Sequence, residues 1–84
     1  MIEIRFFAAL RERVGSDSLM VTPPDGVETV AALVAWLADD NVSVARALEA
    51  TPRYMVAVNE VLSQEQAAVR DGDVVALFPP VTGG

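Results

Sequence analysis

One apolar stripe at helical spacing constrains the fold of this chain more than any other feature of its sequence. The stripe recurs at i, i+3, i+4 and i+7, which predicts an amphipathic helix that must bury one side against another element. Its members are Val30, Leu33, Val34 and Leu37. Thr29 stands at the expected N-cap position. The Asp-Asp-Asn run at residues 39–41 is expected to stop the helix early, because acids are unfavourable near a helix C-terminus.

Strand-like segments flank this helix on both sides. At the start of the chain, Ile2, Ile4 and Phe6 alternate with Glu3, Arg5 and Phe7, and this period of two predicts a half-buried strand. The predicted strands cover residues 2–7, 18–22, 54–58, 61–62 and 74–78. The last segment is apolar almost throughout, which predicts a central strand buried on both sides near its end.

The remaining segments carry weaker signals. Residues 8–13 predict a short helical turn or a loop, and residues 43–50 predict a second, shorter helix with Ser43 as its cap. Residues 63–69 predict a loop or a single helical turn. Tight turns are expected at Asn59-Glu60 and at Asp71-Gly72-Asp73. The second turn is not expected to bind calcium, because the EF-hand spacing and its terminal glutamate are absent.

The order of these elements is strand, strand, helix, short helix and three strands. It predicts an α+β fold in which a mixed sheet of about five strands carries one main helix on one face. A chain of 84 residues is long enough for one domain only. We expect the domain to cover residues 1–78, followed by a flexible tail over residues 79–84 that ends in Gly-Gly.

The composition excludes most side-chain chemistry. Cysteine, histidine and lysine are all absent, so no disulfide, metal centre or Ser-His pair is expected, and the chain is not expected to catalyse a reaction alone. The net charge is −6 and the six arginines are scattered, which argues against nucleic acid. No basic tract, signal peptide or membrane-spanning run is found, so we expect no membrane partner and a cytoplasmic location.

The C-terminal tail is the remaining candidate for chemistry. Residues 78–84 read Phe-Pro-Pro-Val-Thr-Gly-Gly. Two prolines favour an extended exit from the fold, and glycine lets a backbone enter a narrow channel. Gly-Gly alone is also what a frayed terminus looks like. The rigid Phe-Pro-Pro directly after a core strand favours the interpretation that the Gly84 carboxylate is the reactive group, activated by another enzyme.

Several motifs together make the whole chain resemble the ubiquitin-like sulfur carriers, and among them most closely the small subunits of molybdopterin synthase. The tail with Phe-Pro-Pro is the most specific element. The matching segments are Ile4-Arg5-Phe6-Phe7-Ala8, Arg11-Glu12-Arg13-Val14-Gly15, Thr29-Val30-x-x-Leu33, Val58-Asn59, Asp71-Gly72-Asp73-x-Val75-Ala76 and residues 78–84.

The resemblance implies a ubiquitin-like β-grasp fold and a cycle in which Gly84 carries sulfur. An E1-like adenylating enzyme uses ATP to form an acyl-adenylate at Gly84, and a sulfur donor converts it to a thiocarboxylate. The large subunit of molybdopterin synthase then takes the tail, with Thr82 and Gly83 in the threaded segment. Sulfur passes to cyclic pyranopterin monophosphate within a heterotetramer. No permanently bound cofactor is implied, and nucleotide is bound only at the adenylation step.

Docking residues are predicted beside the tail. Phe7 is expected to be exposed and to form an apolar patch with Phe78, Pro79, Pro80 and Val81, although residues such as Leu10 could instead cover it.

Charged residues have two open roles as well. Arg11 and Arg13 could pair with acids of a partner or simply be solvated. The acids Glu3, Glu60, Glu65 and Asp73 are expected on solvated faces, where they could steer the chain toward a basic partner.

Three other functions remain open from the sequence. The chain could carry sulfur for thiamine or cysteine synthesis, although thiamine carriers usually lack much of the segment at residues 43–52. It could be a protein modifier conjugated through Gly84. It could also be an interaction module whose terminus is inert.

Overall fold

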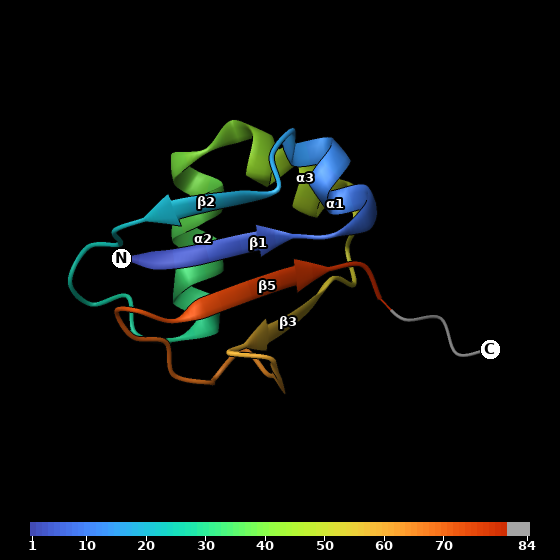
Figure 1. Cartoon of the computed structure of the whole chain (residues 1–84). Helices are drawn as coiled ribbons and strands as arrows, with labels where there is room; N and C mark the ends of the chain where they lie inside the picture. Colours follow the sequence, from blue (N-terminus) through green and yellow to red (C-terminus); the bar gives the residue numbers. More distant parts are fainter. Residues whose placement is uncertain (81–84) are drawn as a thin grey trace.

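The structure, a computed structural model, describes residues 1–80, and the last four residues of the chain lie outside the described part. Three helices and five strands follow one another along it (Figure 1). They are β1 (Ile2–Phe6), α1 (Ala8–Val14), β2 (Ser18–Val21), α2 (Val30–Asp40), α3 (Val42–Ala50), β3 (Met55–Val58), β4 (Val61–Ser63) and β5 (Val74–Phe78). No helix among residues 1–80 is long and apolar enough to cross a bilayer.

The strands form one mixed sheet in the order β2-β1-β5-β3-β4. Strand β5 lies in the centre, parallel to β1 and antiparallel to β3. Helix α2 crosses behind the sheet, and α1 and α3 cover the end of the same layer (Figure 1). The predicted α+β architecture with a five-stranded mixed sheet is therefore confirmed.

The core lies between the sheet and the helices. All four members of the α2 stripe are buried, as the periodicity predicts. They pack with the inward side chains of β1 and β5, which are Ile2, Ile4, Phe6, Val75 and Leu77. The central strand is the exception to the sequence-based expectation. Val75 and Leu77 are fully buried, but Val74, Ala76 and Phe78 remain partly exposed because no helix within residues 1–80 covers the other face of the sheet.

For two connecting segments the structure decides between the helical turn and the loop that the sequence leaves open. Residues 8–14 form a true helix, which ends at Gly15, where φ is 84° and the N–H donates to the Arg11 carbonyl over 2.9 Å. Residues 63–69 contain no helix. They hold a turn closed from the Ala67 N–H to the Gln64 carbonyl, and Ala68 forms a bridge with Thr29.

The turn between β3 and β4 is tied to the start of β5. Asn59 and Glu60 have φ values of 50° and 68°, as a tight two-residue hairpin requires. The Asn59 amide donates to the Asp73 carboxylate over 3.0 Å and accepts from the Val74 N–H at the same distance. Asp73 also accepts from the Arg70 N–H over 2.8 Å. Its carboxylate is therefore a structural acceptor on a face that is still partly exposed to solvent, as the sequence predicts.

The cap of α3 also differs from the expectation. Asn41, not Ser43, is the N-cap, and its side-chain oxygen accepts from the N–H groups of Ser43 and Val44 over 2.9 and 3.2 Å. Asn41 at the same time ends α2, which includes both Asp39 and Asp40. One residue therefore closes one helix and starts the next.

This cap gives a stability prediction. The Asn41→Ala variant is expected to lose about 1 kcal/mol of unfolding free energy, because two N–H groups lose their acceptor. Ser43→Ala serves as the matched control and is expected to change stability by no more than a few tenths of that amount. Denaturant unfolding of both variants measures the difference. Equal losses in the two variants would contradict the assignment of Asn41 as the cap.

Candidate functional site

The candidate site lies where the central strand ends. Phe78 is the last residue of β5 and is flanked by β1 on one side and β3 on the other. The Phe7 N–H donates to the Leu77 carbonyl over 3.1 Å, and Met55 is the register partner of Phe78. The chain therefore leaves the sheet from a strand that is held on both sides, which fixes the direction in which the following residues start.

Three side chains form a row across the strands at this exit. Because Phe6 is paired with Leu77, continuing the register places Phe7 beside Phe78, and Met55 lies opposite Phe78 on β3. We call Phe7, Phe78 and Met55 the exit row. Phe7 is 45% exposed and the other two are partly exposed, whereas Leu10 is fully buried in the core. The predicted exposure of Phe7 is confirmed, and Leu10 does not cover it.

The exit row belongs to a larger uncovered surface, the open face, which is the side of the sheet away from the helices. Alternation along each strand and the register between strands place its members on one side. Beyond the exit row they are Glu3, Arg5, Ser18, Met20, Ala57, Leu62, Val74 and Ala76. Met20 and Leu62 are 57% and 61% exposed, so this surface combines large apolar groups with few charges.

The charges on the open face are already paired. The Arg5 guanidinium donates to the Glu3 carboxylate over 2.5 Å, and this hydrogen bond raises the pKa of Arg5 above its ordinary value. Removing a paired acid and base from water costs less free energy than removing two unpaired charges. The open face is therefore chemically suited to contact another protein.

The other predicted docking residues are placed less decisively. Pro79 is partly exposed and Pro80 is exposed, both directly after the exit row. Arg11 is exposed in α1, and its guanidinium lies 3.8 Å from the Asp17 carboxylate, which is too long for a hydrogen bond. Arg13 is exposed as well. Contact of these residues with a partner stays a prediction.

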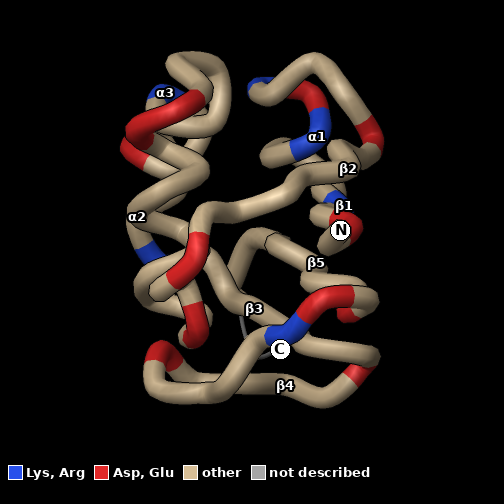
Figure 2. The backbone as a smooth tube through the Cα atoms, turned by 90° about the vertical axis from the view of Figure 1, so that its left-hand side faces the viewer, with Lys and Arg blue, Asp and Glu red and all other residues tan. Residues whose placement is uncertain are grey.

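The predicted reactive and threading residues lie outside the described part of the chain. They are Val81, Thr82, Gly83 and Gly84. Within residues 1–80, no group of acidic side chains is arranged to hold a metal ion. The arginines are spread over several elements (Figure 2), with Arg5 in β1, Arg11 and Arg13 in α1, and Arg46 in α3.

Sequence reasoning missed part of this site. Met55, Met20 and Leu62 were not singled out, although each belongs to the open face. Period-two alternation places Met55 and Ala57 on one side of β3, but only the pairing of β3 with β5 brings Met55 next to Phe78. That contact joins segments far apart in the sequence and leaves no local signal.

Comparison with known proteins agrees with this geometry. The model of the ThiS family matches residues 4–84, which is almost the whole chain and includes its C-terminal glycines. The chain belongs to the ThiS family. Two curated relatives of the chain are each called molybdopterin synthase sulfur carrier subunit. The protein from Escherichia coli strain K12 is 43% identical and that from Haemophilus influenzae is 39% identical, each over the full length of both chains.

Two solved structures of related proteins have the same fold as this chain. Small archaeal modifier protein 1 from H. volcanii is 31% identical with a TM-score of 0.74, over 95% of this chain and 97% of that chain. A chain of the complex of subunits 1 and 2 of molybdopterin-converting factor from Helicobacter pylori is 26% identical with a TM-score of 0.65, over 99% and 97%. The predicted resemblance to ubiquitin-like sulfur carriers is confirmed.

Proposed function

We propose that this ThiS-family chain is the sulfur-carrier small subunit of a molybdopterin synthase. The observation that carries the proposal is that the central strand ends at Phe78 beside an apolar open face, and that Pro-Pro-Val-Thr-Gly-Gly follows it in the sequence. Full-length similarity to two proteins called molybdopterin synthase sulfur carrier subunit supports it. The absence of cysteine is compatible with it, because the sulfur would travel on the backbone carboxylate of Gly84.

The chemistry then proceeds at the chain terminus and is catalysed by partners. An E1-like enzyme joins the Gly84 carboxylate to the adenylyl group of ATP and releases pyrophosphate. Sulfur from a donor displaces AMP and leaves a thiocarboxylate. Inside the large subunit this sulfur passes to cyclic pyranopterin monophosphate, and hydrolysis restores the carboxylate. This chain contributes the terminus, the extended segment that reaches an active site, and the surface that docks; it needs no bound cofactor of its own.

The open face is the proposed contact with the large subunit. Phe7, Phe78 and Met55 surround the point from which the tail starts, so a partner that receives the tail covers them at the same time. The complex of two subunits of molybdopterin-converting factor from Helicobacter pylori supports such an arrangement. Arg11, Pro79, Pro80 and Val81 belong to the same proposed contact.

Intact mass spectrometry tests the chemical step. The purified chain is incubated with an adenylating enzyme, ATP and a sulfur source, and we expect the mass increase that corresponds to sulfur in place of one oxygen, located at Gly84. Omitting ATP is the control and is expected to leave the mass unchanged. An unmodified terminus under conditions that convert a known carrier would overturn the proposal.

A second function has one specific observation in its favour. The similarity to small archaeal modifier protein 1 favours a protein modifier conjugated through Gly84. Since the chain has no lysine, its own side chains offer no acceptor for lysine-linked chains. A ladder of covalent conjugates to other proteins would favour this function, whereas a thiocarboxylate that is consumed by the large subunit favours the carrier. Carriers for thiamine or cysteine synthesis would instead leave the large subunit unbound.

A further inference from the structure

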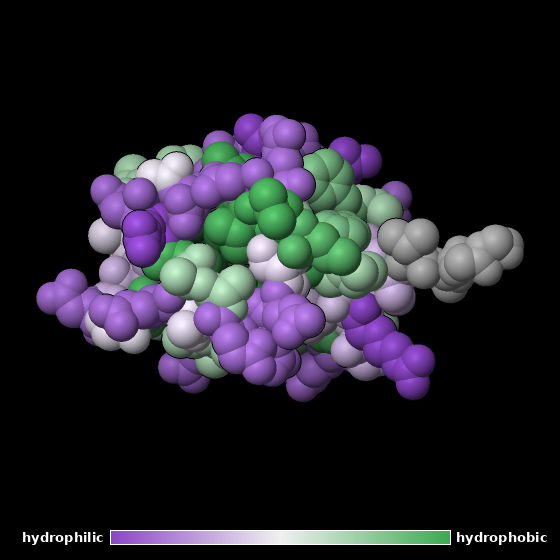
Figure 3. Space-filling view, turned by 90° about the horizontal axis from the view of Figure 1, so that it is seen from below, coloured by the Kyte–Doolittle hydropathy of each residue, from purple (hydrophilic) through white to green (hydrophobic). Residues whose placement is uncertain are grey.

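A groove separates α2 from the β3–β4 hairpin and shares only Met55 and Leu62 with the open face. Its volume is about 800 Å³. Helix α2 contributes Val30, Ala31, Val34 and Ala35, and the hairpin contributes Val56 and Ser63. Ala31 and Ala35 are exposed and lie one turn apart, so two small side chains leave the space open. Figure 3 shows hydrophobic residues gathered in the middle of the side that carries this hairpin, with hydrophilic residues around them.

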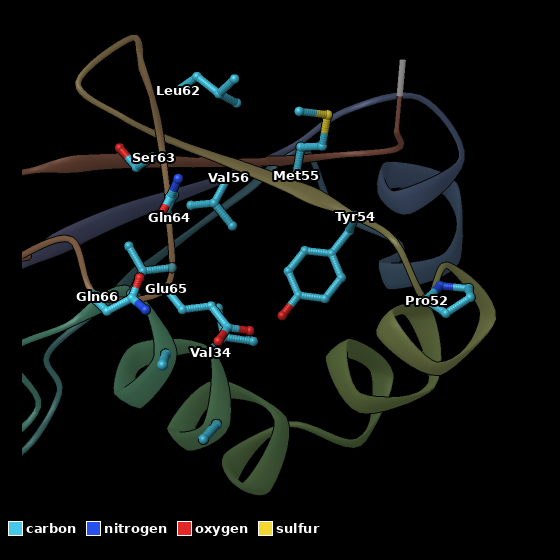
Figure 4. A pocket seen from close by; sticks show the side chains of 13 residues that line it. Val34, Pro52, Tyr54, Met55, Val56, Leu62, Ser63, Gln64, Glu65 and Gln66 are labelled. Atoms are coloured by element: carbon cyan, nitrogen blue, oxygen red, sulfur yellow. The ribbon is translucent and has the colours of Figure 1, made fainter. Parts of the chain in front are cut away.

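The groove is apolar on its α2 side, whereas residues 63–66, at the end of β4 and just after it, give the opposite side a polar lining. Among the described residues, Glu65 is the only charged one that lines it, and no arginine does. The Tyr54 hydroxyl and the Glu65 carboxylate both point into the space between β3 and α2 (Figure 4). Burial, and to a lesser extent the Glu65 charge, raises the pKa of Tyr54 above its ordinary value. Neither side chain has a hydrogen-bond partner within residues 1–80.

The rim of the groove is the edge of the sheet. Strand β4 is the last strand in the order and pairs with β3 on one side only. An edge strand presents backbone N–H and C=O groups to any extended segment that lies beside it. Leu62, in the middle of β4, is 61% exposed and lies with Met55 at the outer border of the groove (Figure 4).

We propose that this groove docks an extended segment of a partner protein, with an apolar side chain over the α2 alanines and a lysine or arginine paired with Glu65. The free strand edge selects an extended backbone, and a single carboxylate with no arginine beside it in the lining selects a cation. The C-terminal carboxylate of this chain is a poor occupant, because it would face the like charge of Glu65. The inference does not depend on sulfur transfer at Gly84, and it remains testable if that proposal fails.

The test uses the full chain and two blocked peptides, Thr-Val-Thr-Lys-Thr and Thr-Val-Thr-Glu-Thr. In an extended peptide the valine and the charged residue point to the same side. Amide NMR titration is expected to show saturable shifts at Ala31, Ala35, Leu62 and Glu65. The lysine peptide is expected to bind about fivefold tighter than the glutamate peptide, because an exposed ion pair contributes up to ~1 kcal/mol.

Matched variants separate charge from shape. Glu65→Lys is expected to reverse the preference, so that the glutamate peptide binds more tightly than the lysine peptide. The fold stays intact, because Glu65 is joined to α2 through its backbone carbonyl, which accepts from the Ala31 N–H, and the substitution keeps that bond. Glu60→Lys makes the same charge change in the adjacent turn, outside the groove lining, and is expected to keep the preference. Ala35→Gln fills the groove and is expected to abolish binding of both peptides. Ala50→Gln makes the same change at an exposed alanine of α3 and is expected to leave binding of both peptides unchanged.

Three results would overturn the inference. The first is the absence of saturable shifts at the groove, or shifts confined to the open face. The second is an unchanged peptide preference in Glu65→Lys. The third is a set of groove shifts that depends on protein concentration without peptide, because the occupant would then be a second copy of this chain.

Discussion

A chain extended by one alanine after Gly84 is expected to lose thiocarboxylate formation by at least ~100-fold, since a 1 Å misplacement of a reacting group already costs about that much. The added residue moves the terminal carboxylate by about 3.3–3.6 Å and places a Cβ beside it. Thermal stability is expected to stay unchanged, because the last strand ends at Phe78. Intact mass after incubation with the adenylating enzyme, ATP and a sulfur source measures the loss, and circular dichroism measures the stability.

Deleting Gly84 is the companion variant. It leaves a glycine at the terminus, so no Cβ is added, but it draws the carboxylate back by one residue. If the position of the terminal carboxylate decides its reactivity, neither the deleted nor the extended chain forms the thiocarboxylate. If only the Cβ matters, the deletion retains activity. Normal thiocarboxylation of the extended chain would contradict the assignment of Gly84 as the reactive residue.

The Phe7→Ala variant is expected to bind the large subunit about 30-fold more weakly, which corresponds to the ~2 kcal/mol typical of an aromatic residue at the centre of an interface. Phe7 is suited to this test because its side chain is 45% exposed, and because alanine retains its backbone hydrogen bonds, which join it to Leu77 and to the first turn of α1. Phe78 is only partly exposed at the end of the central strand, so truncating it also perturbs the fold. Calorimetry with the purified large subunit measures the affinity.

Val42→Ala is the control for this measurement. Val42 is 63% exposed at the start of α3 and does not belong to the open face. Its truncation is expected to leave the affinity unchanged. If Phe7→Ala also binds with unchanged affinity, the exit row is not the docking surface. Mass spectrometry of the same variant then shows whether sulfur loading continues without that contact.

Local patterns explain why much of the fold was predictable. The α2 stripe, the Thr29 cap and the alternation in β1 each depend on residues within a few positions of one another, and all three are present as expected. The cap of α3 was misassigned, because Asn41 and Ser43 are both good caps and only the path of the chain out of α2 selects between them. The expectation that β5 is buried on both faces was wrong, because an apolar run does not reveal whether a helix covers each face. Within residues 1–80, helices cover one face of β5 only.

The candidate site shows the same difference between residues with a local sequence signal and residues that only tertiary contacts bring together. Phe7, Phe78 and the prolines were identified from the sequence because they border a recognisable tail. Met55 was missed, because its place in the exit row follows from the antiparallel pairing of β3 with β5. The groove was missed as well, since Ala31, Ala35 and Glu65 are ordinary residues until α2 and the hairpin face one another.

By itself, the sequence determined the class of this protein: one small α+β domain without cysteine, histidine or lysine, with Gly-Gly as its last two residues. These properties depend on composition and on short-range spacing. The tertiary structure alone decided that the central strand ends at Phe78 between two neighbouring strands, beside an open apolar face, and that a groove with one carboxylate lies next to that face. Those features arise from strand pairing and helix packing between distant segments, and such contacts are set by how the whole core closes.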